Sequence, residues 1–382
     1  MRDAVIVQAV RTPVGKRNGG LSEVQPADLS AHVLKSLAER TGIDPGVVDD
    51  VVWGCVGQVG EQSLDIARNA VLGAGWPESV PGVTVDRQCG SSQQAVSFAA
   101  ASVIAGHYDV VVAGGVESMS RVPMGMSVAG KWPFGDGFSA RYKGIAPNQG
   151  IGAEMIVDRW GFSRSQLDEY SLESHAKAAA AQDEGRFTAE IAPVTDPSGT
   201  KVEADEGIRR GSTLEALGAL KPAFRPQGGT ITAGNSSQIS DGAAALLITT
   251  SEKAAELGLT PIARIHTAVV TGDDPVIMLT GPIPATAKAL QRSGLSIDDI
   301  GAFEVNEAFA PVPLAWLAET GADPTLLNPS GGAIALGHPL GGSGARIMTT
   351  LVHHMHATGT RYGLQTMCEG GGQANATILE LL

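Results

Sequence analysis

Cysteine, aromatic residues and net positive charge are all scarce in this chain. Only three cysteines occur in 382 residues, which excludes a disulfide framework and predicts a reducing, cytoplasmic environment. Aromatic residues make up 4%, whereas glycine occurs 49 times, and this balance favours closely packed helices and strands. The formal net charge of −13 argues against a nucleic-acid partner, because phosphate neutralisation requires a basic surface.

Long apolar runs and nucleotide-binding loops are missing as well. No apolar stretch approaches the roughly 20 residues of a membrane-spanning helix, so we expect no membrane contact. Met1-Arg2-Asp3 leads directly into the strand-like segment 4–7, and we therefore expect no signal peptide. Gly15-Lys16 lacks the upstream glycine of a P-loop, and no G-x-G-x-x-G follows a predicted strand. Nucleotide hydrolysis and hydride transfer consequently have little support.

The first third of the chain alternates between strand and helix patterns. Apolar runs predict strands at 5–7, 51–54, 83–85 and 109–113, and helices are predicted at 26–40, 66–72 and 93–105. The helix at 93–105 is small and apolar nearly all round, so we expect it to be buried on every side. Alternating strands and helices indicate an α/β fold with a largely parallel sheet.

The pattern breaks between about 117 and 236 and then returns. This region contains a Gly-, Pro- and Trp-rich stretch at 123–147 and a helix at 164–184, and it has the character of an inserted lid or substrate-binding segment. A strand follows at 241–248. From about 260 the chain weakly repeats its first part, with strands at 326–327 and 364–367 and a helix at 343–356. We therefore expect two similar halves, with ligands at the carboxyl ends of their strands.

Two cysteines and one histidine lie in glycine-dense loops. They are Cys89 in Asp86–Ser92, His338 in Gly337-His338-Pro339, and Cys368 in Cys368–Gln373. Glycine lets the backbone approach a ligand closely and frees N–H groups to point into a site. Because a thiol in such a loop can be a nucleophile or a proton carrier, the pattern predicts cysteine-based acyl transfer.

Each of the three residues has a chemical interpretation and a plainer one. Cys89 stands between a predicted strand and a predicted helix, where the helix dipole would lower its pKa and favour the thiolate; the alternative is a buried structural cysteine. His338, fixed by Pro339, is placed to deprotonate a thiol or to hold an oxyanion rather than to be a satisfied core histidine. Cys368 ends a predicted strand, and the glycines after it could form an anion-holding nest.

Other candidates are weaker. Asn306 follows a predicted strand at 302–305 and opens a helix, so it could cap that helix or hold a water or a histidine in the site. Cys55 is more consistent with packing. His353, His354 and His356 indicate a surface histidine run, because no Cys or acidic spacing supports a metal site, and we expect no bound metal.

Taken together, these motifs resemble the thiolase family over essentially the whole chain. The matching blocks are Arg11-Thr12-Pro13 with Gly15, the Cys89 loop, 114–120, 234–237, 241–244, 306–309, 331–346 and 368–373. The resemblance implies an α/β, thiolase-like fold of two similar mixed-sheet halves packed together. It places an N-terminal domain at 1–253, with an inserted CoA-binding loop domain at about 117–236, and a C-terminal domain at 259–382.

The resemblance also implies a reversible Claisen exchange on coenzyme A thioesters, with cleavage of 3-ketoacyl-CoA to acetyl-CoA or propionyl-CoA and a shortened acyl-CoA. By this analogy Cys89 carries the acyl group, His338 activates it, and Cys368 is the acid and base. Asn306 would hold a water in one oxyanion hole, and the N–H groups of Cys89 and Gly370 would form another. No permanent cofactor is expected, since coenzyme A is a substrate, and the family forms dimers and tetramers.

Coenzyme A is an anion, so a chain with a negative net charge needs a locally basic segment to bind it. Between Gly207 and Pro226 the chain carries Arg209, Arg210, Lys221 and Arg225 against one acid. By resemblance this is the family's CoA-binding loop, with contacts at Arg209, Ala233, Ser237 and Phe309. A solvated basic patch is the alternative.

Several positions depart from the pattern of short-chain biosynthetic thiolases. Asn148-Gln149-Gly150 replaces His-Met-Gly, and Ser92, Gln238, Glu369 and Ala374 are also unusual. These changes favour a degradative 3-ketoacyl-CoA thiolase of lipid β-oxidation over an acetoacetyl-CoA thiolase, and segments 15–19 and 238–242 are similar to thiolases of actinobacterial steroid and branched-lipid breakdown. A ketosynthase-type condensing enzyme would pair its cysteine with two histidines, and a Cys-His-Asn hydrolase would not need Cys368. A noncatalytic thiolase-like scaffold would not need Cys89, His338 and Cys368 together.

Overall fold

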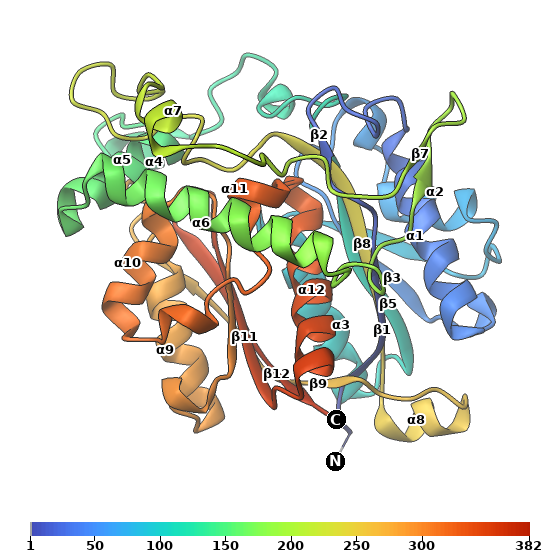
Figure 1. Cartoon of the computed structure of the whole chain (residues 1–382). Helices are drawn as coiled ribbons and strands as arrows, with labels where there is room; N and C mark the ends of the chain where they lie inside the picture. Colours follow the sequence, from blue (N-terminus) through green and yellow to red (C-terminus); the bar gives the residue numbers. More distant parts are fainter. Residues whose placement is uncertain (1) are drawn as a thin grey trace.

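A computed structural model describes residues 2–382 as two sheet-bearing halves with helices on both sides of each sheet (Figure 1). The strands run in the order β10-β11-β12-β9-β1-β8-β5-β3-β4, and β2 (Gly15–Lys16) pairs with β8. The N-terminal half contains β1 (Val5–Arg11), β3 (Asp50–Gly54), β4 (Gly82–Val85), β5 (Val110–Ser118) and β8 (Ser240–Thr249). The C-terminal half contains β9 (Ala263–Gly272), β10 (Ala302–Val305), β11 (Tyr362–Glu369) and β12 (Gln373–Leu381).

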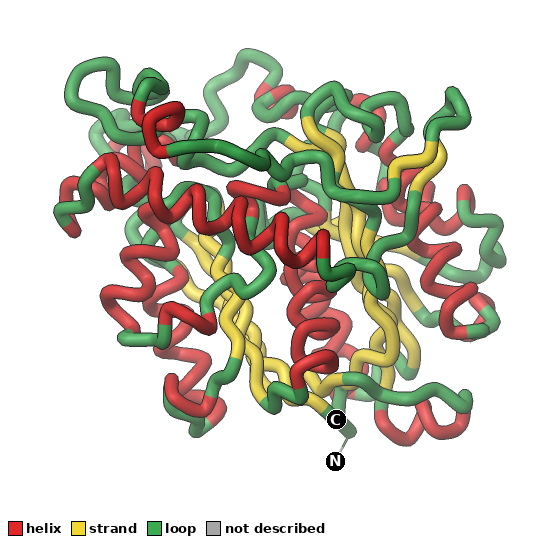
Figure 2. The backbone as a smooth tube through the Cα atoms, viewed as in Figure 1, coloured by secondary structure: helices red, strands yellow, loops and turns green. Residues whose placement is uncertain are grey.

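The two halves share a central helical layer. Helices α3 (Ser91–Ala105) and α12 (Ser343–Thr358) lie side by side between the two groups of strands, as Figures 1 and 2 show. Their apolar side chains form one core cluster with residues of β5 and β8. The strands of the two halves meet only where β1 pairs with β9, at Val5 with Arg264 and Ile6 with Ala263. The central helices therefore carry most of the packing between the halves.

The expectation of a largely parallel sheet is wrong, and the mixed sheet implied by the family resemblance is present. Only β3–β4, β3–β5 and β10–β11 are parallel within the large sheet. The pairs β1–β8, β5–β8, β9–β12 and β11–β12 are antiparallel. The reason is local: β11 and β12 are joined by the three-residue turn 370–372, which is far too short for a parallel crossover.

The predicted helices form with recognisable ends. In α1 (Pro26–Thr41), the Gln25 side chain accepts hydrogen bonds from the first turn, and Gly42 closes the helix in a left-handed conformation with φ 69°. The remaining helices are α2 (Ile66–Gly73), α4 (Asp136–Arg141), α5 (Gln149–Trp160), α6 (Arg164–Asp183), α7 (Leu214–Gly218), α8 (Ser251–Glu256), α9 (Pro282–Ser293), α10 (Pro311–Thr320) and α11 (Ala333–Leu336).

Four local expectations are wrong. Helix α3 is not buried on every side, since Phe98 is 46% and Ile104 45% exposed. Strand β5 continues through its two glycines to Ser118. The segment predicted as a strand at 326–327 is a 3-10 turn followed by one bridge from Leu327 to Phe303. Asn306 does not open a helix, because α10 begins only at Pro311.

The segment between β5 and β8 lies across one end of the sheet. It includes α4 to α7 and a small hairpin of β6 (Val194–Thr195) and β7 (Lys201–Val202), and it forms the upper layer in Figure 1. Within residues 2–382, no helix has the length and apolar character needed to cross a membrane.

Candidate active site

Cys89 sits in a tight turn between β4 and α3. Gln88 adopts a left-handed conformation with φ 50°, a strained region for a residue with a side chain. The turn is closed by the Ser91 hydroxyl, which donates to the Gln88 carbonyl at 2.5 Å and accepts from the Arg87 N–H at 2.9 Å. These contacts hold the Cys89 thiol at the edge of the strands, immediately before the helix.

The thiol of Cys89 is not activated by the helix terminus in the resting protein. Burial raises its pKa to about 12, with a further upward contribution from the Glu369 carboxylate. The N–H groups of Cys89 itself and of Gly370 act in the opposite direction. The expectation of a lowered pKa is therefore wrong, because desolvation and a nearby carboxylate outweigh the helix dipole. Cys89 needs a base or a bound substrate to become a thiolate.

His338 is buried and neutral. Burial, with the nearby charge of Arg346, lowers its pKa to about 3. Its Nδ1 lies 2.6 Å from the Ser343 hydroxyl, and its Nε2 lies 3.5 Å from Asn306 Nδ2. A neutral imidazole can accept a proton, so the side chain keeps the chemical capacity of a base.

Asn306 faces His338 from the loop after β10. Its backbone N–H donates to the Thr366 carbonyl at 3.1 Å, which ties this loop to β11. Its side-chain Oδ1 is buried and has no hydrogen-bond partner. A buried amide oxygen without a partner is a place where a water or a ligand group gains a hydrogen bond.

Cys368 lies one residue before the end of β11 and is buried. Its pKa is raised well above the ordinary value by burial and then by the neighbouring Cys89 and Glu369. The charge coupling with Cys89 means that the two thiols share one small volume. Gly370 follows them and directs its N–H at the Cys89 sulfur. Cys89, Cys368 and Gly370 thus lie together, and the Asn306–His338 pair is joined to the same strand, β11, by the hydrogen bond from Asn306 to Thr366.

Many glycines of the site serve packing more than ligand binding. A Cβ on Gly344 would lie 2.3 Å from the Gln93 nitrogen, and one on Gly54 would lie 2.3 Å from the Ser92 nitrogen. A Cβ on Gly115 would lie 2.5 Å from the Gly341 carbonyl oxygen. These contacts let the first turn of α3 approach β3 and let the first turns of α3 and α12 approach each other. The interpretation of the glycines as ligand-facing residues is therefore too broad.

Two buried glutamates organise the loops and were given no role by sequence reasoning. Glu117 accepts from the N–H groups of Val56, Gly57 and Gly341 and from Gln62. Glu307 accepts from the hydroxyls of Tyr170 and Ser174, from Asn328 and from the Ile334 N–H. The sequence signal that could have identified Glu307 was its position directly after the candidate residue Asn306. Each carboxylate joins segments that are distant in sequence.

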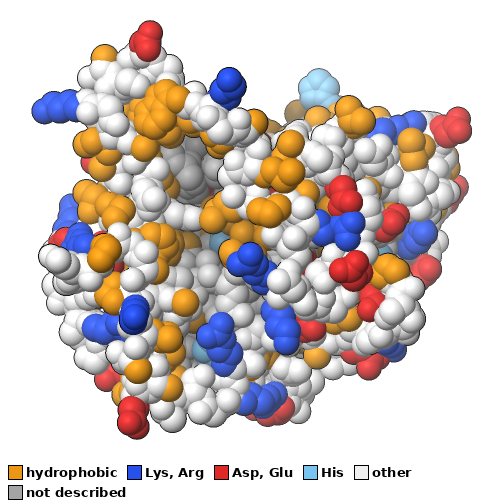
Figure 3. All heavy atoms as spheres, turned by 90° about the horizontal axis from the view of Figure 1, so that it is seen from above, with side chains coloured by type: hydrophobic (Ala, Val, Ile, Leu, Met, Phe, Trp, Pro, Cys, Tyr) orange, Lys and Arg blue, Asp and Glu red, His pale blue; other side chains and the backbone are white. Residues whose placement is uncertain are grey.

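A pocket of about 810 Å³ opens beside His338. Its wall includes the predicted contact residues Arg209, Ala233, Ser237 and Phe309. Seen from above in Figure 3, basic and hydrophobic side chains gather around a hollow in this face. The Ser237 N–H donates to the Ala308 carbonyl at 3.0 Å, and Phe224 packs edge-on against Phe309. The two loops that form the wall therefore support each other.

The basic character of the pocket comes only in part from the residues that were expected to supply it. Arg210 is paired with Asp183, and Arg225 with Asp158, both through two hydrogen bonds. Arg209 keeps its place in the pocket wall, where Lys16 and Arg17 of the β2 hairpin join it. Sequence reasoning missed the last two because their position depends on β2 pairing with β8.

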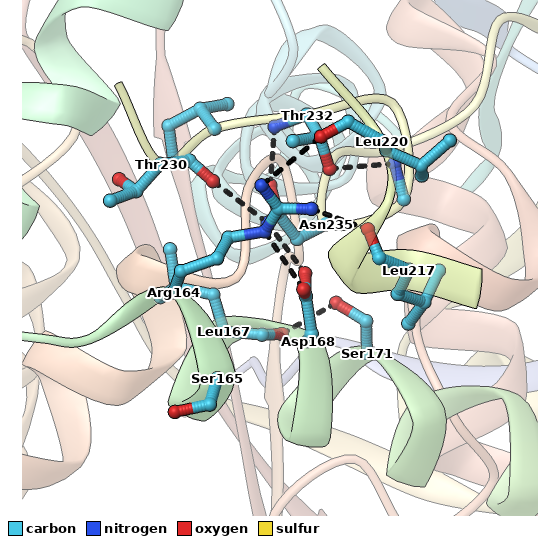
Figure 4. Close-up of polar contacts among 12 residues, drawn as sticks. Arg164, Ser165, Leu167, Asp168, Ser171, Leu217, Leu220, Thr230, Thr232 and Asn235 are labelled. Carbon is cyan, nitrogen blue, oxygen red and sulfur yellow. Dashed lines mark hydrogen bonds and ion pairs between the residues drawn. The ribbon is translucent and has the colours of Figure 1, made fainter. Parts of the chain in front are cut away.

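A polar network behind the pocket anchors residues 230–235 to α6 (Figure 4). Asn235 donates to Asp168 at 2.9 Å and to the Thr230 carbonyl at 3.0 Å, and it accepts from the Thr232 N–H at 2.8 Å. Arg164 donates to Asp168 from the other side at 2.8 Å. Because Asn235 precedes Ser236 and Ser237, this network positions the serines that line the pocket.

Two of the unusual residues have structural roles. Asn148 caps α5 by accepting hydrogen bonds from the N–H groups of Gly150 and Ile151. Gln238 donates to the carbonyls of Gly207, Ile334 and Ala335, and so joins the pocket loop to the His338 loop. Cys55 is fully buried in the N-terminal core. Within residues 2–382, no three His, Cys, Asp or Glu side chains are grouped as metal ligands.

Comparisons with known proteins agree with this arrangement. The thiolase N-terminal domain matches residues 4–252, and the thiolase C-terminal domain matches residues 259–381. A steroid 3-ketoacyl-CoA thiolase of Mycobacterium tuberculosis is 50% identical over all of this chain and 95% of its own length. A 3-ketoacyl-CoA thiolase of Aliivibrio salmonicida is 48% identical over the full length of both chains.

A solved structure is similar throughout. The acetyl-CoA acetyltransferase of Bacillus anthracis superposes with a TM-score of 0.91 at 38% identity, covering 100% of this chain and 99% of its own. With both family domains matched and full-length relatives near 50% identity, the chain belongs to the thiolase family.

Proposed function

We propose that this enzyme cleaves 3-ketoacyl-CoA with coenzyme A, giving acetyl-CoA or propionyl-CoA and a shortened acyl-CoA. The observation that carries the proposal is the pair of coupled thiols, Cys89 and Cys368, with the Gly370 N–H directed at Cys89. The buried, neutral His338 and its partner Asn306 supply the base, and Asn306 is tied to β11 beside Cys368. One thiol can hold an acyl group while the other moves a proton. Full-length relatives named 3-ketoacyl-CoA thiolase support this reaction.

The chemistry follows from the placement of the groups. The Cys89 sulfur attacks the 3-keto carbon while its proton passes to His338 Nε2. The bond between C2 and C3 then breaks, which leaves the acyl group on Cys89 and an acetyl-CoA carbanion that takes the proton of Cys368. Coenzyme A attacks the acyl-enzyme and its thiol proton passes to the Cys368 thiolate. The bond between the acyl carbon and Cys89 then breaks, and the Cys89 thiolate takes its proton back from His338. The reverse sequence is Claisen condensation, and no resident cofactor is needed.

Negative charge on oxygen would be stabilised at two places. The N–H groups of Cys89 and Gly370 both point at the Cys89 sulfur, so they are positioned for the oxyanion of the tetrahedral intermediate. Asn306, with its unpartnered Oδ1 and its side chain against His338, is suited to hold a water for the thioester oxygen.

Coenzyme A would occupy the pocket of about 810 Å³ beside His338. Arg209, Ala233, Ser237 and Phe309 would contact it, and Lys16 and Arg17 add positive charge for its phosphates. This assignment extends the proposed domain organisation, in which an inserted CoA-binding loop domain at about 117–236 belongs to an N-terminal domain at 1–253. Residues 259–382 would then form the C-terminal domain.

A biosynthetic acetoacetyl-CoA thiolase is the second candidate. The similarity to the Bacillus anthracis acetyl-CoA acetyltransferase favours it. The higher identity to 3-ketoacyl-CoA thiolases, one of them a steroid thiolase, favours degradation of longer or polycyclic substrates. The two candidates share the chemistry and differ in the acyl group.

The decisive experiment is CoA-dependent thiolysis of a panel of short, long, branched and polycyclic 3-ketoacyl-CoAs. We expect turnover that is faster with the larger acyl groups than with acetoacetyl-CoA. Preference for acetoacetyl-CoA would favour the biosynthetic candidate, and no turnover of any member would contradict the proposal.

Two variants separate the roles of the thiols. Cys89→Ala should form no acyl-enzyme detectable by mass spectrometry and should lose at least about a thousandfold in thiolysis. Cys368→Ala should still be acylated at Cys89 but should fail to exchange the α-protons of acetyl-CoA with deuterium. Thiolysis by Cys89→Ala near the wild-type rate would contradict the assignment of the nucleophile.

A further inference from the structure

Glu369 is a buried carboxylic acid that the proposed reaction does not use. Its side chain is 0% exposed, and neither carboxylate oxygen has a hydrogen-bond partner. It follows Cys368 directly at the end of β11, where it pairs with Gln373 of β12. An orphaned carboxyl group in a protein interior is costly and requires an explanation.

The carboxyl group lies against the nucleophile loop. A Cβ on Gly90 would be only 1.9 Å from Glu369 Oε1, so the acid fills the space that the missing side chain of Gly90 leaves. Gly90 is the residue after Cys89. Glu369 is therefore the chain neighbour of Cys368, and its side chain lies against the loop that carries Cys89.

The charged and titratable groups that face Glu369 are few. Arg87 approaches from the nucleophile loop, where its guanidinium donates to Gln373 Oε1 at 2.7 Å. Cys89 lies on the same loop and Cys368 on the same strand, and Glu117 of β5 adds negative charge near Cys89. Three acids, Cys89, Cys368 and Glu369, thus share one desolvated volume, with Arg87 as the cation that faces it.

We propose that Glu369 is a positioning residue that takes up the first negative charge of this three-acid cluster as the pH rises, so that both thiols stay protonated at alkaline pH until substrate binds. The inference rests on the proposed thiolysis and deepens it. In cleavage, Cys368 has to enter as a thiol, because it gives a proton to the departing carbanion. A group that ionises in its place keeps Cys368 in the thiol form that this step requires.

The order of ionisation agrees with this role. Burial raises the pKa of Glu369 to about 8, while the charge of Arg87 partly opposes the rise. The pKa of Cys89 is about 12, and that of Cys368 is well above its ordinary value. Since like charges in one site ionise in sequence, the first proton leaves Glu369 and its charge makes both thiols weaker acids.

Alkylation by iodoacetamide reports the thiolate fraction of each cysteine directly. We would compare the wild type with Glu369→Gln and Glu369→Met between about pH 7 and pH 9 and quantify modification of Cys89 and Cys368 by peptide mass spectrometry. Above about pH 8, where Glu369 is ionised in the wild type, both variants should react about tenfold faster at Cys89, which corresponds to a shift of about one pH unit. Near pH 7, where the carboxyl group is protonated, their rates should approach that of the wild type. Asp50→Asn removes another buried carboxyl group, at the start of β3 and thus at the end of the strand away from the Cys89 loop, and should leave both rates unchanged.

Activity gives an independent readout. In Glu369→Gln the alkaline limb of kcat/KM for thiolysis should move to lower pH, because Cys368 loses its proton earlier. If folded Glu369 variants still catalyse thiolysis but are alkylated at unchanged rates, the charge role of Glu369 is wrong and the proposed thiolysis stands. Faster alkylation in an enzyme that cleaves no 3-ketoacyl-CoA would support the charge role and contradict the proposed function instead.

Folding of the variants is expected, since Met has a similar length and removes an unpartnered charge. Should both variants fail to fold, infrared titration of the wild type decides. Loss of a protonated carboxyl band near pH 8 before any loss of the S–H bands supports the proposal. Loss of an S–H band first contradicts it.

Discussion

The tautomer of His338 is determined by one hydroxyl group. Ser343 donates its only hydroxyl proton to the Pro339 carbonyl at 2.8 Å, so it can only accept from His338 Nδ1 at 2.6 Å. The ring proton is therefore on Nδ1, and the lone pair of Nε2 faces Asn306. A base with its lone pair on the wrong nitrogen could not take the proton of a thiol.

Replacing Ser343 tests this arrangement. Ser343→Ala should lower kcat for thiolysis by about ten- to a hundredfold while changing KM little, because ring orientation and not substrate contact is lost. Ser343→Thr keeps the hydroxyl and should retain most of the activity. Steady-state kinetics at several pH values provide the measurement. A kcat of Ser343→Ala equal to that of the wild type would show that Ser343 does not control the histidine.

At the scale of elements, the first turns of α3 and α12 lie close together because glycine leaves no side chain between them. Gly344 lies in α12, where alanine would ordinarily stabilise a helix by up to about 1 kcal/mol. A Cβ there would meet the Gln93 backbone at 2.3 Å, and this backbone cannot move without displacing the nucleophile turn. Packing between elements therefore outweighs helix propensity at this position.

Gly344→Ala should accordingly lower the free energy of unfolding by about 1–3 kcal/mol. The matched control is Gly137→Ala in α4, where nothing lies within 4 Å of the added Cβ; it should be neutral or slightly stabilising. Urea unfolding followed by circular dichroism measures both. If Gly344→Ala were as stable as the wild type, the close approach of the two helices would not be a constraint.

Local sequence patterns predicted most of the helices and strands. Strand direction and the partners of charged side chains depend on long-range contacts, which local patterns do not reveal. Helices α1, α6 and α12 begin and end near their predicted limits because their caps and apolar faces are local. Strand direction was wrong because it depends on which strands become neighbours. The same holds for Arg210 and Arg225, whose acidic partners lie 27 and 67 residues away, and for Lys16, which reaches the pocket through strand pairing. The catalytic candidates were visible because glycine-rich loops flank them.

At the scale of the whole molecule, one edge of the large sheet is open. Strand β4 is the last strand and pairs only with β3 among residues 2–382. Val83 of β4 and Phe98 and Ile104 of the adjacent α3 are exposed. An open edge beside exposed apolar side chains is a surface that natural proteins normally cover.

A second copy of this chain is the partner we expect on that edge, in keeping with a dimer or a tetramer. Two copies can pair their β4 edges about a twofold axis, which buries Phe98 and Ile104 of both subunits.

Phe98→Glu should then place two like charges in the interface and convert the assembly toward monomers in analytical ultracentrifugation. Leu214→Glu alters a similarly exposed side chain on α7 and should leave the sedimentation coefficient unchanged. Because the α3 face opposite Phe98 supports the Cys89 turn, dissociation should also lower thiolysis at low protein concentration. A wild-type enzyme that sediments as a monomer, or a Phe98→Glu variant that sediments with the wild type, would exclude this edge as the subunit interface.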